Sequence, residues 1–473
     1  MDPPILRLLR LHAIEFKTPS DPDWGIYSST YNLRVPAIPE VVVLPATIRQ
    51  VSQAVRCADT CSFKVQARSG GHSYASHSNG GMDGSVVIDL RKLQDISLKA
   101  DGIVRVGGGV RLGRLANTIF EQGGRALAHG TCPAVGVGGH FTHGGFGHPS
   151  RAWGLSMDQI VEVEVVTRHG RVLSASESKN KDLFVAIRGA ADSFGIVVSF
   201  YLRTQPAPKT VVKWSIDAPE AIQSVESAVA AFQLLQDFAH DASIVDRKLS
   251  LVVFLSHNRF SLEGTYLGEM NTFNSKILPE LLRVFPKKGA VKADSRQVDW
   301  QALLRLLAGD MDLEVSPDYA EHHTFFAKSA AVLHPGLSRD SLESYFQYIL
   351  REGASAPISY FIGVQLYGGA DSQITANTAD DSYGHRDAMW MFQHYGFVDN
   401  KKTFPEGGIR FIQGLNDALG PGHGASNNYA DASLGPGEAQ KLYYGEKLEG
   451  LMRLKSVLDP HDVFSHPQSI RSE

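Results

Sequence analysis

The 473 residues, 43% of them hydrophobic, exceed the about 250–300 that a single core usually holds, so two domains are expected. The 46 basic and 50 acidic residues give a formal net charge of −4 and form no long basic run, which argues against a nucleic-acid partner and favours a small neutral substrate. No apolar run approaches the about 20 residues of a membrane-spanning helix, so no membrane partner is expected.

The beginning of the chain, residues 1–13, has charges within a short apolar stretch and no small-residue cleavage site, which is not typical of a secretory signal. Cys57 and Cys61 lie four residues apart in a predicted helix that begins near Thr47. A disulfide there would constrain little, so we expect both thiols to pack in the core. These features favour an intracellular location over secretion.

Short strands are predicted at 39–45 and 63–68, on either side of the helix at 47–59, and again at 85–90 and 103–109. Glycines at 107–109 follow a strand and precede a helix that begins near Arg111. Such a position offers backbone N–H groups and a helix dipole to a phosphate, although glycines there also serve ordinary tight turns. The sequence favours the phosphate site and leaves the turn open.

Two glycine-rich stretches each hold one nucleophilic side chain: His72 in residues 68–74 and Cys132 in residues 129–140. Glycine lets a backbone approach a flat or phosphorylated ligand closely. A lone His in such a loop is usually a turn residue, and a lone Cys is usually a small buried hydrophobe. The two stretches together favour a ligand-attachment site.

His140 and His143 follow in the second stretch at a spacing of three, and neither a carboxylate nor a thiolate joins them in a ligand pattern. No metal is therefore expected.

The second half of the chain has a different pattern. Strands are predicted there at 248–255, 260–266 and 358–367, and helices at 220–238 and 342–353, whereas the half-buried strand predicted at 160–167 belongs to the preceding part. From Pro206 onward this order indicates an antiparallel sheet with helices on one side.

The two nucleophile-bearing loops, the segment 426–431 and the closing run 443–470 resemble the berberine-bridge-enzyme-like branch of the vanillyl-alcohol-oxidase flavoproteins, in particular its oligosaccharide oxidases. The resemblance implies an α+β fold, with a PCMH-type FAD-binding domain and a substrate domain whose antiparallel β-sheet is flanked by helices. It assigns residues 1–205, completed by 415–473, to the first domain and 206–414 to the second.

The resemblance also implies FAD bonded to His72 at the flavin 8α-methyl and to Cys132 at carbon 6. Val135 matches a position where a small residue gives oxygen access to the ring, which favours an oxidase, although it is equally suited to core packing. The other residues expected at the cofactor are Arg68, Ser69, Gly70, Gly71, Ser73, Thr131, Gly136, Gly138, Gly139, His140, Gly144, Ile196 and Asn428.

For catalysis, the resemblance points to Tyr429 as the base, and a tyrosine packed under the flavin is the alternative. A free phenol has a pKa of about 10, so a base of this type needs a partner that favours phenolate. The position of the family's carboxylate holds Gln365 here, which cannot accept a proton at neutral pH.

Substrate contacts are expected from Tyr74, Phe361 and Gly363. Gly363 stands where the family has a polar sugar contact, and Ser426 replaces an aromatic residue, so sugar recognition is expected to differ. His385 and Arg386 match a pair whose role is structural as much as binding.

The predicted activity is that of an FAD-dependent oxidase, which transfers hydride from an alcohol to flavin N5 and reduces O2 to H2O2. The reducing-end hydroxyl of an oligosaccharide is the first substrate expected. A non-sugar alcohol or secondary metabolite, and a flavin carrier or dehydrogenase with little turnover, are the alternatives.

Overall fold

The computed structural model describes residues 3–285 and 291–472. The N-terminal part begins with helix α1 (Pro4–Leu11) and a four-stranded sheet in the order β1-β2-β4-β3. Its strands are β1 (Phe16–Lys17), β2 (Val41–Val43), β3 (Val65–Arg68) and β4 (Val86–Asp89). Both β2 and β3 pair with β4 in parallel, as the predicted strand–helix–strand unit requires.

Helix α3 (Ile48–Thr60) connects β2 to β3, and Thr47 Oγ1 caps it by accepting a hydrogen bond from the backbone N–H of Gln50 at 3.2 Å. Cys57 lies on its buried face, Cys61 ends it half-buried, and both thiols are free. The prediction that these cysteines pack in the core is confirmed.

A second sheet has the antiparallel order β5-β6-β10-β8-β9. Its strands are β5 (Ile96–Leu98), β6 (Ile103–Gly107), β8 (Ile160–Val166), β9 (Val172–Ser176) and β10 (Ile196–Arg203). Helices α4 (Leu112–Gly123), α5 (Val137–Thr142) and α7 (Lys181–Ala190) pack in the same core, and β7 (Arg125–Ala126) pairs with β11 (Gln205–Pro206).

The phosphate site predicted at 107–109 is not found there, because the backbone N–H groups of these three glycines already donate to the carbonyls of Asp95, Val198 and Leu93. The glycines also pack against neighbouring backbone. A Cβ on Gly109 would lie 1.9 Å from the carbonyl oxygen of Leu90, and one on Gly108 would lie 2.5 Å from that of Val197. The run is therefore needed for close packing, and none of its members lines the cavity described below.

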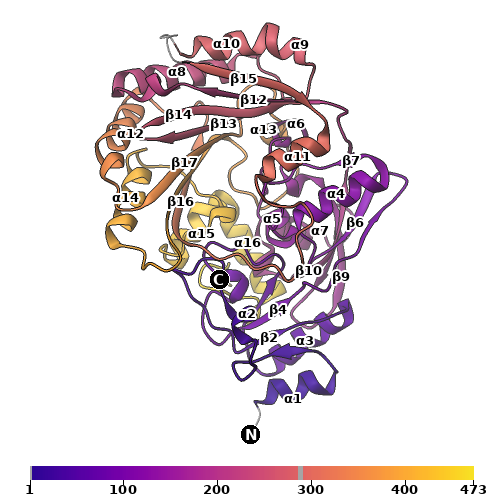
Figure 1. Cartoon of the computed structure of the whole chain (residues 1–473). Coiled ribbons are helices and arrows are strands. Elements are labelled where there is room, and N and C mark those ends of the chain that lie inside the picture. Colours follow the sequence, from indigo (N-terminus) through magenta and orange to yellow (C-terminus); the bar gives the residue numbers. More distant parts are fainter. Residues whose placement is uncertain (1–2, 286–290, 473) are drawn as a thin grey trace.

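The third sheet is seven-stranded and antiparallel, in the order β15-β12-β14-β13-β17-β18-β16. Its strands are β12 (Val211–Asp217), β13 (Leu249–Ser256), β14 (Arg259–Tyr266), β15 (Lys292–Val298), β16 (Thr324–Leu333), β17 (Ser359–Leu366) and β18 (Ala388–Val398). Helices α8 (Val225–His240), α12 (Arg339–Glu352) and α14 (Glu406–Asp417) cover its outer face (Figure 1). The predicted antiparallel sheet with helices on one side is confirmed.

Alternation along the strands gives this sheet two different faces. On β17, Ile362, Val364 and Leu366 are fully buried in the core shared with the helices. The intervening Gly363 and Gln365 point the other way, towards a cavity. The sheet therefore forms one wall of that cavity.

The end of the chain returns to the N-terminal part through α15 (Pro436–Tyr444) and α16 (Leu448–Leu458). Lys455 on α16 is fully buried, and its ammonium group donates to the carbonyl oxygens of Ser193 at 2.6 Å and Phe464 at 2.9 Å and to Asp459 at 2.8 Å. The backbone N–H of Val65 in β3 donates to the carbonyl of Val463 at 2.8 Å. Residues more than 390 positions apart thus lie side by side (Figure 1).

The remaining helices are short: α2 (Trp24–Ser28), α6 (Ser150–Trp153), α9 (Met270–Thr272), α10 (Leu278–Arg283), α11 (Trp300–Ala308) and α13 (Gln373–Ala376). Within the described ranges, none of the helices has the length and apolar character needed to cross a lipid bilayer.

Candidate active site

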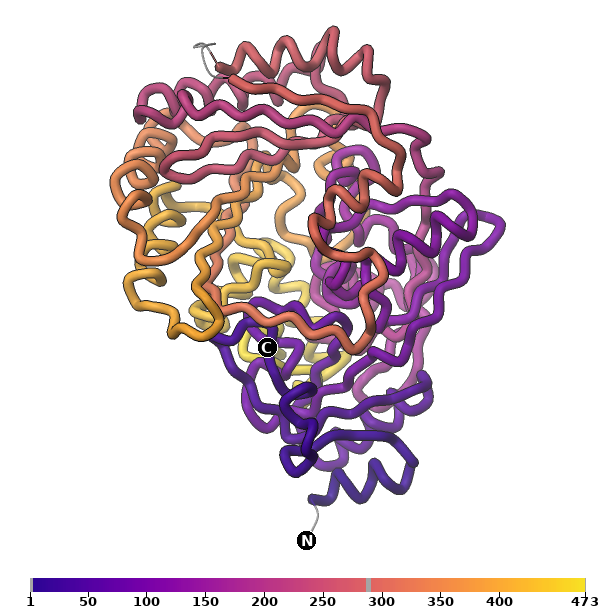
Figure 2. Tube along the Cα trace, in the orientation of Figure 1, coloured from indigo at the N-terminus to yellow at the C-terminus, as the bar shows by residue number. Residues whose placement is uncertain are grey.

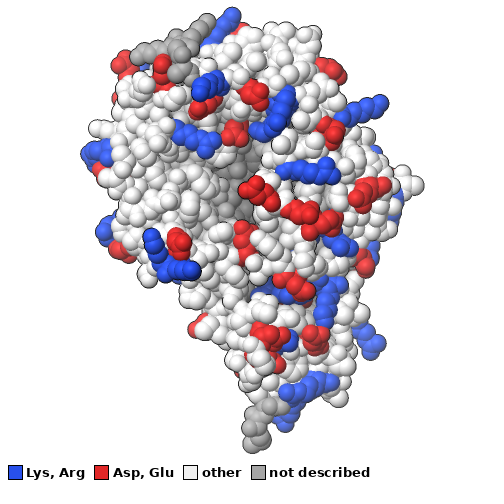
Figure 3. Space-filling model, in the orientation of Figure 1, with Lys and Arg blue, Asp and Glu red and all other residues white. Residues whose placement is uncertain are grey.

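A cavity of about 530 Å³ lies between the two glycine-rich loops, the open face of the seven-stranded sheet and the segment 426–430. Figure 3 shows that this face of the molecule is hollowed near its middle, with acidic side chains along one rim. Among the described residues that line the cavity, Asp192 is the one carboxylate, and there is no Lys, Arg or Glu. The histidines 72, 77, 140, 143 and 148 are its other ionisable groups apart from Cys132 and tyrosines.

The two glycine-rich loops cross each other at Gly70 and Gly136. A Cβ on Gly70 would lie 2.2 Å from the backbone nitrogen of Gly136, so neither position accepts a side chain. Ser69 ties the loops together, because its hydroxyl donates to the carbonyl of Gly108 at 2.7 Å and accepts from the N–H of Gly138 at 3.2 Å. Gly139 has nothing within 4 Å of its would-be Cβ and leaves room for a ligand.

His72 and Cys132 meet at one end of the cavity. One ring nitrogen of His72, the sulfur of Cys132 and a carboxylate oxygen of Glu321 all lie within 4.8 Å of one another. Burial lowers the pKa of the His72 imidazole to about 4 and raises that of the Cys132 thiol. The imidazole is therefore neutral near pH 7, with a lone pair free to form a bond, and the thiol keeps its proton.

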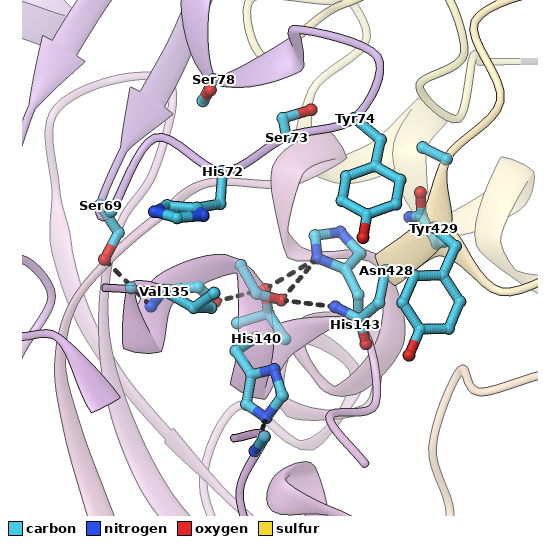
Figure 4. A pocket seen from close by; sticks show the side chains of 18 of the residues that line it. Ser69, His72, Ser73, Tyr74, Ser78, Val135, His140, His143, Asn428 and Tyr429 are labelled. Atoms are coloured by element: carbon cyan, nitrogen blue, oxygen red, sulfur yellow. Dashed lines mark hydrogen bonds between the residues drawn. The ribbon is translucent and has the colours of Figure 1, made fainter. Parts of the chain in front are cut away.

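Tyr429 and Tyr74 lie across the cavity from His72, with ring centroids 5.8 Å apart (Figure 4). Each phenol oxygen accepts a hydrogen bond from a glutamine of the sheet: Gln365 Nε2 donates to Tyr429 and Gln393 Nε2 donates to Tyr74, both at 3.0 Å. Burial raises the pKa of Tyr429, and the bond from Gln365 lowers it. Oε1 of Gln365 is buried without a partner among the described residues.

Gly363 opens a notch in the sheet wall. In the ladder it lies opposite Phe254 on β13 and Gln393 on β18. The atoms nearest to a Cβ built on Gly363 belong to these two side chains, each at 4.0 Å. A larger residue would therefore project into the cavity without meeting backbone.

A cluster of ionisable groups lines another part of the cavity wall. The Asp192 carboxylate lies 3.1 Å from Nε2 of His143 and 3.0 Å from Nε2 of His466. The ring of His466 stacks on His77 at 3.8 Å. Burial would raise the pKa of Asp192, but the two imidazoles beside it bring that pKa well below its ordinary value. His140 is occupied elsewhere, since its Nε2 accepts from the N–H of Gly130 at 2.9 Å.

Most of the residues expected from the sequence come together at this cavity. Those that line it are Ser69, Gly70, Gly71, His72, Ser73, Tyr74, Thr131, Cys132, Val135, Gly136, Gly138, Gly139, His140, Ile196, Gly363, Gln365, Asn428 and Tyr429. Three others do not line it: Arg68, Gly144 and Phe361. Arg68 is buried in an ion pair with Asp89 at 2.7 Å.

Phe361 is on the same face of the sheet as Gly363 and Gln365 but outside the cavity, where its ring stacks on Tyr395 at 5.1 Å. Asn428 links the two sides of the cavity, because its Oδ1 accepts from the N–H of Gly145 at 3.0 Å. The expected structural pair is anchored: Arg386 bonds Asp158 at 2.5 Å, and His385 contacts the carbonyl of Leu442 at 2.7 Å.

Sequence reasoning missed Asp192, Glu321, Gln393 and Val252. Gln393 was detectable in principle, because it is the polar member of an otherwise apolar and aromatic strand, residues 388–393. Glu321 precedes two histidines in a loop, which marked it as ionisable without placing it beside Cys132. Their positions depend on the tertiary fold.

Comparison with known families finds two matched regions. A model described as "FAD binding domain" matches residues 39–176, and one described as "Berberine and berberine like" matches residues 427–471. The first includes both glycine-rich loops, and the second includes Tyr429.

Individual proteins are similar over nearly the whole chain. The FAD-linked oxidoreductase dpmaF of Metarhizium anisopliae is 34% identical over 97% of this chain and 89% of its own length. The structure of xylooligosaccharide oxidase from Myceliophthora thermophila in complex with xylobiose has a TM-score of 0.94 and 32% identity, with all of both chains covered. Glucooligosaccharide oxidase from Acremonium strictum, whose FAD is described as 6-S-cysteinyl and 8α-N1-histidyl, has a TM-score of 0.94 and 30% identity over all of both chains.

Proposed function

The chain belongs to the berberine-bridge-enzyme-like family of FAD-linked oxidoreductases, and from this membership we propose that it oxidises a hydroxyl group on a neutral substrate with more than one hydroxyl. It is an FAD-dependent oxidase of α+β fold whose cofactor is held covalently through His72 and Cys132. Dioxygen is the electron acceptor, and hydrogen peroxide is the second product.

The described residues fit this cofactor. Two nucleophilic atoms lie within 4.8 Å of each other at one end of the cavity, which suits two bonds to one ring. Gly139, whose would-be Cβ has nothing within 4 Å, gives a ligand close access to backbone. We propose that residues 1–205 and 415–473 bind the cofactor and that 206–414 bind the substrate; helix α14 spans the second boundary.

When bound, FAD accepts hydride from the carbon that bears the substrate hydroxyl and passes the electrons to dioxygen. Tyr429 takes the proton of that hydroxyl. The N–H group of Gln365 favours this transfer, because a hydrogen bond donated to the phenol oxygen stabilises the phenolate. Glutamine thus assists the base as a donor, where a carboxylate would act as an acceptor.

The single observation that carries the substrate proposal is the buried, unpartnered Oε1 of Gln365 beside Tyr429. A buried acceptor without a partner is unfavourable by about 1–3 kcal/mol, so a rotation of the Gln365 amide that brings Oε1 to a second hydroxyl of the substrate would be favoured. The Tyr74 hydroxyl and the Gln393 amide extend this polar row. The absence of Lys, Arg and Glu from the described lining favours a neutral substrate over a charged one. The reducing end of an oligosaccharide meets these requirements.

A second substrate class is a non-sugar alcohol such as a polyketide or other secondary metabolite. It is favoured by Val252, Phe254 and Gly363, which form an open and largely apolar part of the sheet wall. A rigid apolar group would fill that notch.

A substrate panel read out as peroxide tests the proposal. The purified protein is mixed in air with oligosaccharides, polyols, phenolic alcohols and hydroxylated polyketides, and the Tyr429→Phe variant is run in parallel. Peroxide release from a polyhydroxylated neutral compound, abolished in the variant, supports the proposal. Activity restricted to charged or monohydroxylated compounds would contradict it, and reduced flavin that persists in air would contradict the oxidase activity itself.

A further inference from the structure

A segment of the substrate-binding half crosses over the site where His72 and Cys132 meet. This crossing segment, residues 309–323, leads from α11 to β16 and runs beside the N-terminal part of the chain (Figure 2). The N–H of Leu33 donates to the carbonyl of His323 at 2.8 Å, and Arg111 donates to the carbonyl of Tyr319 at 2.7 Å. The segment is thereby anchored on both sides of Glu321.

The Glu321 carboxylate has one committed oxygen and one free oxygen. Oε1 lies 2.7 Å from Nε2 of His323. Oε2 is buried and has no hydrogen-bond partner among the described residues. One carboxylate oxygen of Glu321, the Cys132 sulfur and a His72 nitrogen all lie within 4.8 Å of one another. This separation is close enough for Glu321 to exchange a proton with the thiol through one bridging water.

The two attachment residues have different needs. His72 is neutral near pH 7, because burial lowers its pKa to about 4, and its lone pair attacks without help. Burial raises the pKa of the Cys132 thiol, so it remains protonated, and a thiol must lose its proton to become a nucleophile. The imidazole therefore needs no base before it attacks, whereas the thiol does.

We propose that Glu321 is the base that removes the thiol proton of Cys132 as its sulfur bonds to flavin carbon 6. The S–H and ring C–H bonds break, the S–C bond forms, and both hydrogens leave as protons, the first to Glu321. The bonding electrons reduce the ring system by two, and dioxygen, the acceptor of the oxidase reaction, takes them up as hydrogen peroxide. The inference rests on the proposed function, since it presupposes FAD in this cavity.

His323 is the next proton acceptor after Glu321. A proton that reaches the Glu321 carboxylate can pass to Nε2 of His323 across 2.7 Å. Besides Glu321, the titratable groups that act on Cys132 include Arg111, whose positive charge lowers the pKa of the thiol. The negative charge of Glu321 raises it. The thiol proton is therefore transferred as the S–C bond forms, and not before. If Glu321 acted only through its negative charge, it would slow formation of that bond, because the charge stabilises the protonated thiol.

The two roles predict opposite effects of Glu321→Gln: loss of a base slows formation of the Cys132 bond, whereas loss of a negative charge alone would speed it. Purified protein that holds FAD through His72 is kept in air, denatured at intervals, alkylated with iodoacetamide and digested with trypsin. Cys57 and Cys61 serve as internal standards, because both are free thiols in α3 and at its end. A Cys132 that has bonded to flavin escapes alkylation.

In the wild type we expect Cys132 to be fully blocked. In Glu321→Gln we expect most of Cys132 to be alkylated, the His72 bond to stay intact, and the Cys132 bond to form at least about 100-fold more slowly, the typical effect of a lost general base. Raising the pH towards 10 should restore bond formation, because the thiol then ionises unaided. The matched control is Glu314→Gln, an exposed carboxylate of the same segment that accepts from Asn117 at 2.9 Å; it should behave as wild type.

A Glu321→Gln protein with Cys132 fully blocked, or with both bonds lost together, would overturn the proposal. If that variant fails to fold, Glu321→Asp replaces it; its carboxylate is set back by one methylene, and we expect partial blocking with the same rescue by high pH. A wild-type protein without FAD would refute the proposed function, whereas a bicovalent Glu321→Gln protein would refute only the role of Glu321.

Discussion

The side-chain nitrogen of Gln365 donates a hydrogen bond to the phenol oxygen of Tyr429 across 3.0 Å. Burial raises the pKa of Tyr429, and this bond opposes the rise. Gln365→Leu removes the donor, so the pKa should increase further. Because the phenolate is the reactive form, the rate of flavin reduction should reach half of its maximum at a higher pH than in the wild type.

Stopped-flow single turnovers across a pH series measure this shift. Gln393→Leu is the matched control, since it removes the same kind of donor from Tyr74 and should leave the midpoint unchanged. A midpoint that moves to lower pH in Gln365→Leu would show that the glutamine does not stabilise phenolate.

Tyr429→Phe tests the base directly. We expect flavin reduction by substrate to fall about 10²–10⁴-fold, the typical contribution of general base catalysis, while both covalent bonds to the cofactor remain. Single-turnover rates and flavin absorbance after acid precipitation measure the two properties. A loss of less than tenfold would favour a tyrosine that merely packs against the ring.

His72→Ala and Cys132→Ala should each leave flavin attached through the remaining bond. Acid-precipitated protein is expected to stay yellow in both single variants, with shifted absorbance spectra, and to become colourless in the double variant. Colourless precipitate from a single variant would mean that the second bond does not form alone.

Gly363→Gln should fill the notch between Phe254 and Gln393 without loss of stability, because the nearest atoms lie 4.0 Å from its Cβ. We expect kcat/KM for bulky apolar substrates to fall about tenfold or more, the usual effect of reshaping a binding pocket. Gly264→Ala in the same sheet is the contrasting variant, because its Cβ would lie 1.9 Å from the carbonyl of Ser250 and should lower the melting temperature. Equal thermal effects in the two variants would contradict the notch.

Lys455→Met removes a fully buried ammonium group and leaves Asp459 unpaired. Breaking such a pair from one side destabilises a protein by about 3–5 kcal/mol, so a marked fall in melting temperature is expected in thermal denaturation. Lys441→Met, an exposed position on α15, is the control and should have little effect. Similar melting temperatures for both variants would show that the buried pair does not hold the C-terminal helices.

Local pattern was sufficient for much of the fold. The helix expected at 47–59 is α3 (Ile48–Thr60), and the strand expected at 358–367 is β17 (Ser359–Leu366). In both segments the hydrophobic residues recur at the spacing of the element, and turn or capping residues stand at its ends. The glycine-rich loops around His72 and Cys132 were also identified from sequence, because their composition suits little besides close ligand contact.

The site predictions that were wrong or incomplete concern contacts between segments that are distant in the sequence. The glycines at 107–109 have the local pattern of a phosphate loop, yet Leu90 and Val197 occupy the space beside them. Glu321 lies close to Cys132 only because the segment 309–323 crosses from one half of the chain to the other. No periodicity within a segment encodes such an encounter.

The bond between Val65 and Val463 also determines when the cofactor pocket becomes complete. Phe464, the neighbour of Val463, lines the cavity and is synthesised after both attachment loops. The attachment loops are synthesised early and wait for more than 300 residues of nascent chain before their pocket closes. The cofactor pocket is therefore complete only after synthesis has passed Phe464, and truncation before this residue is expected to prevent flavin attachment.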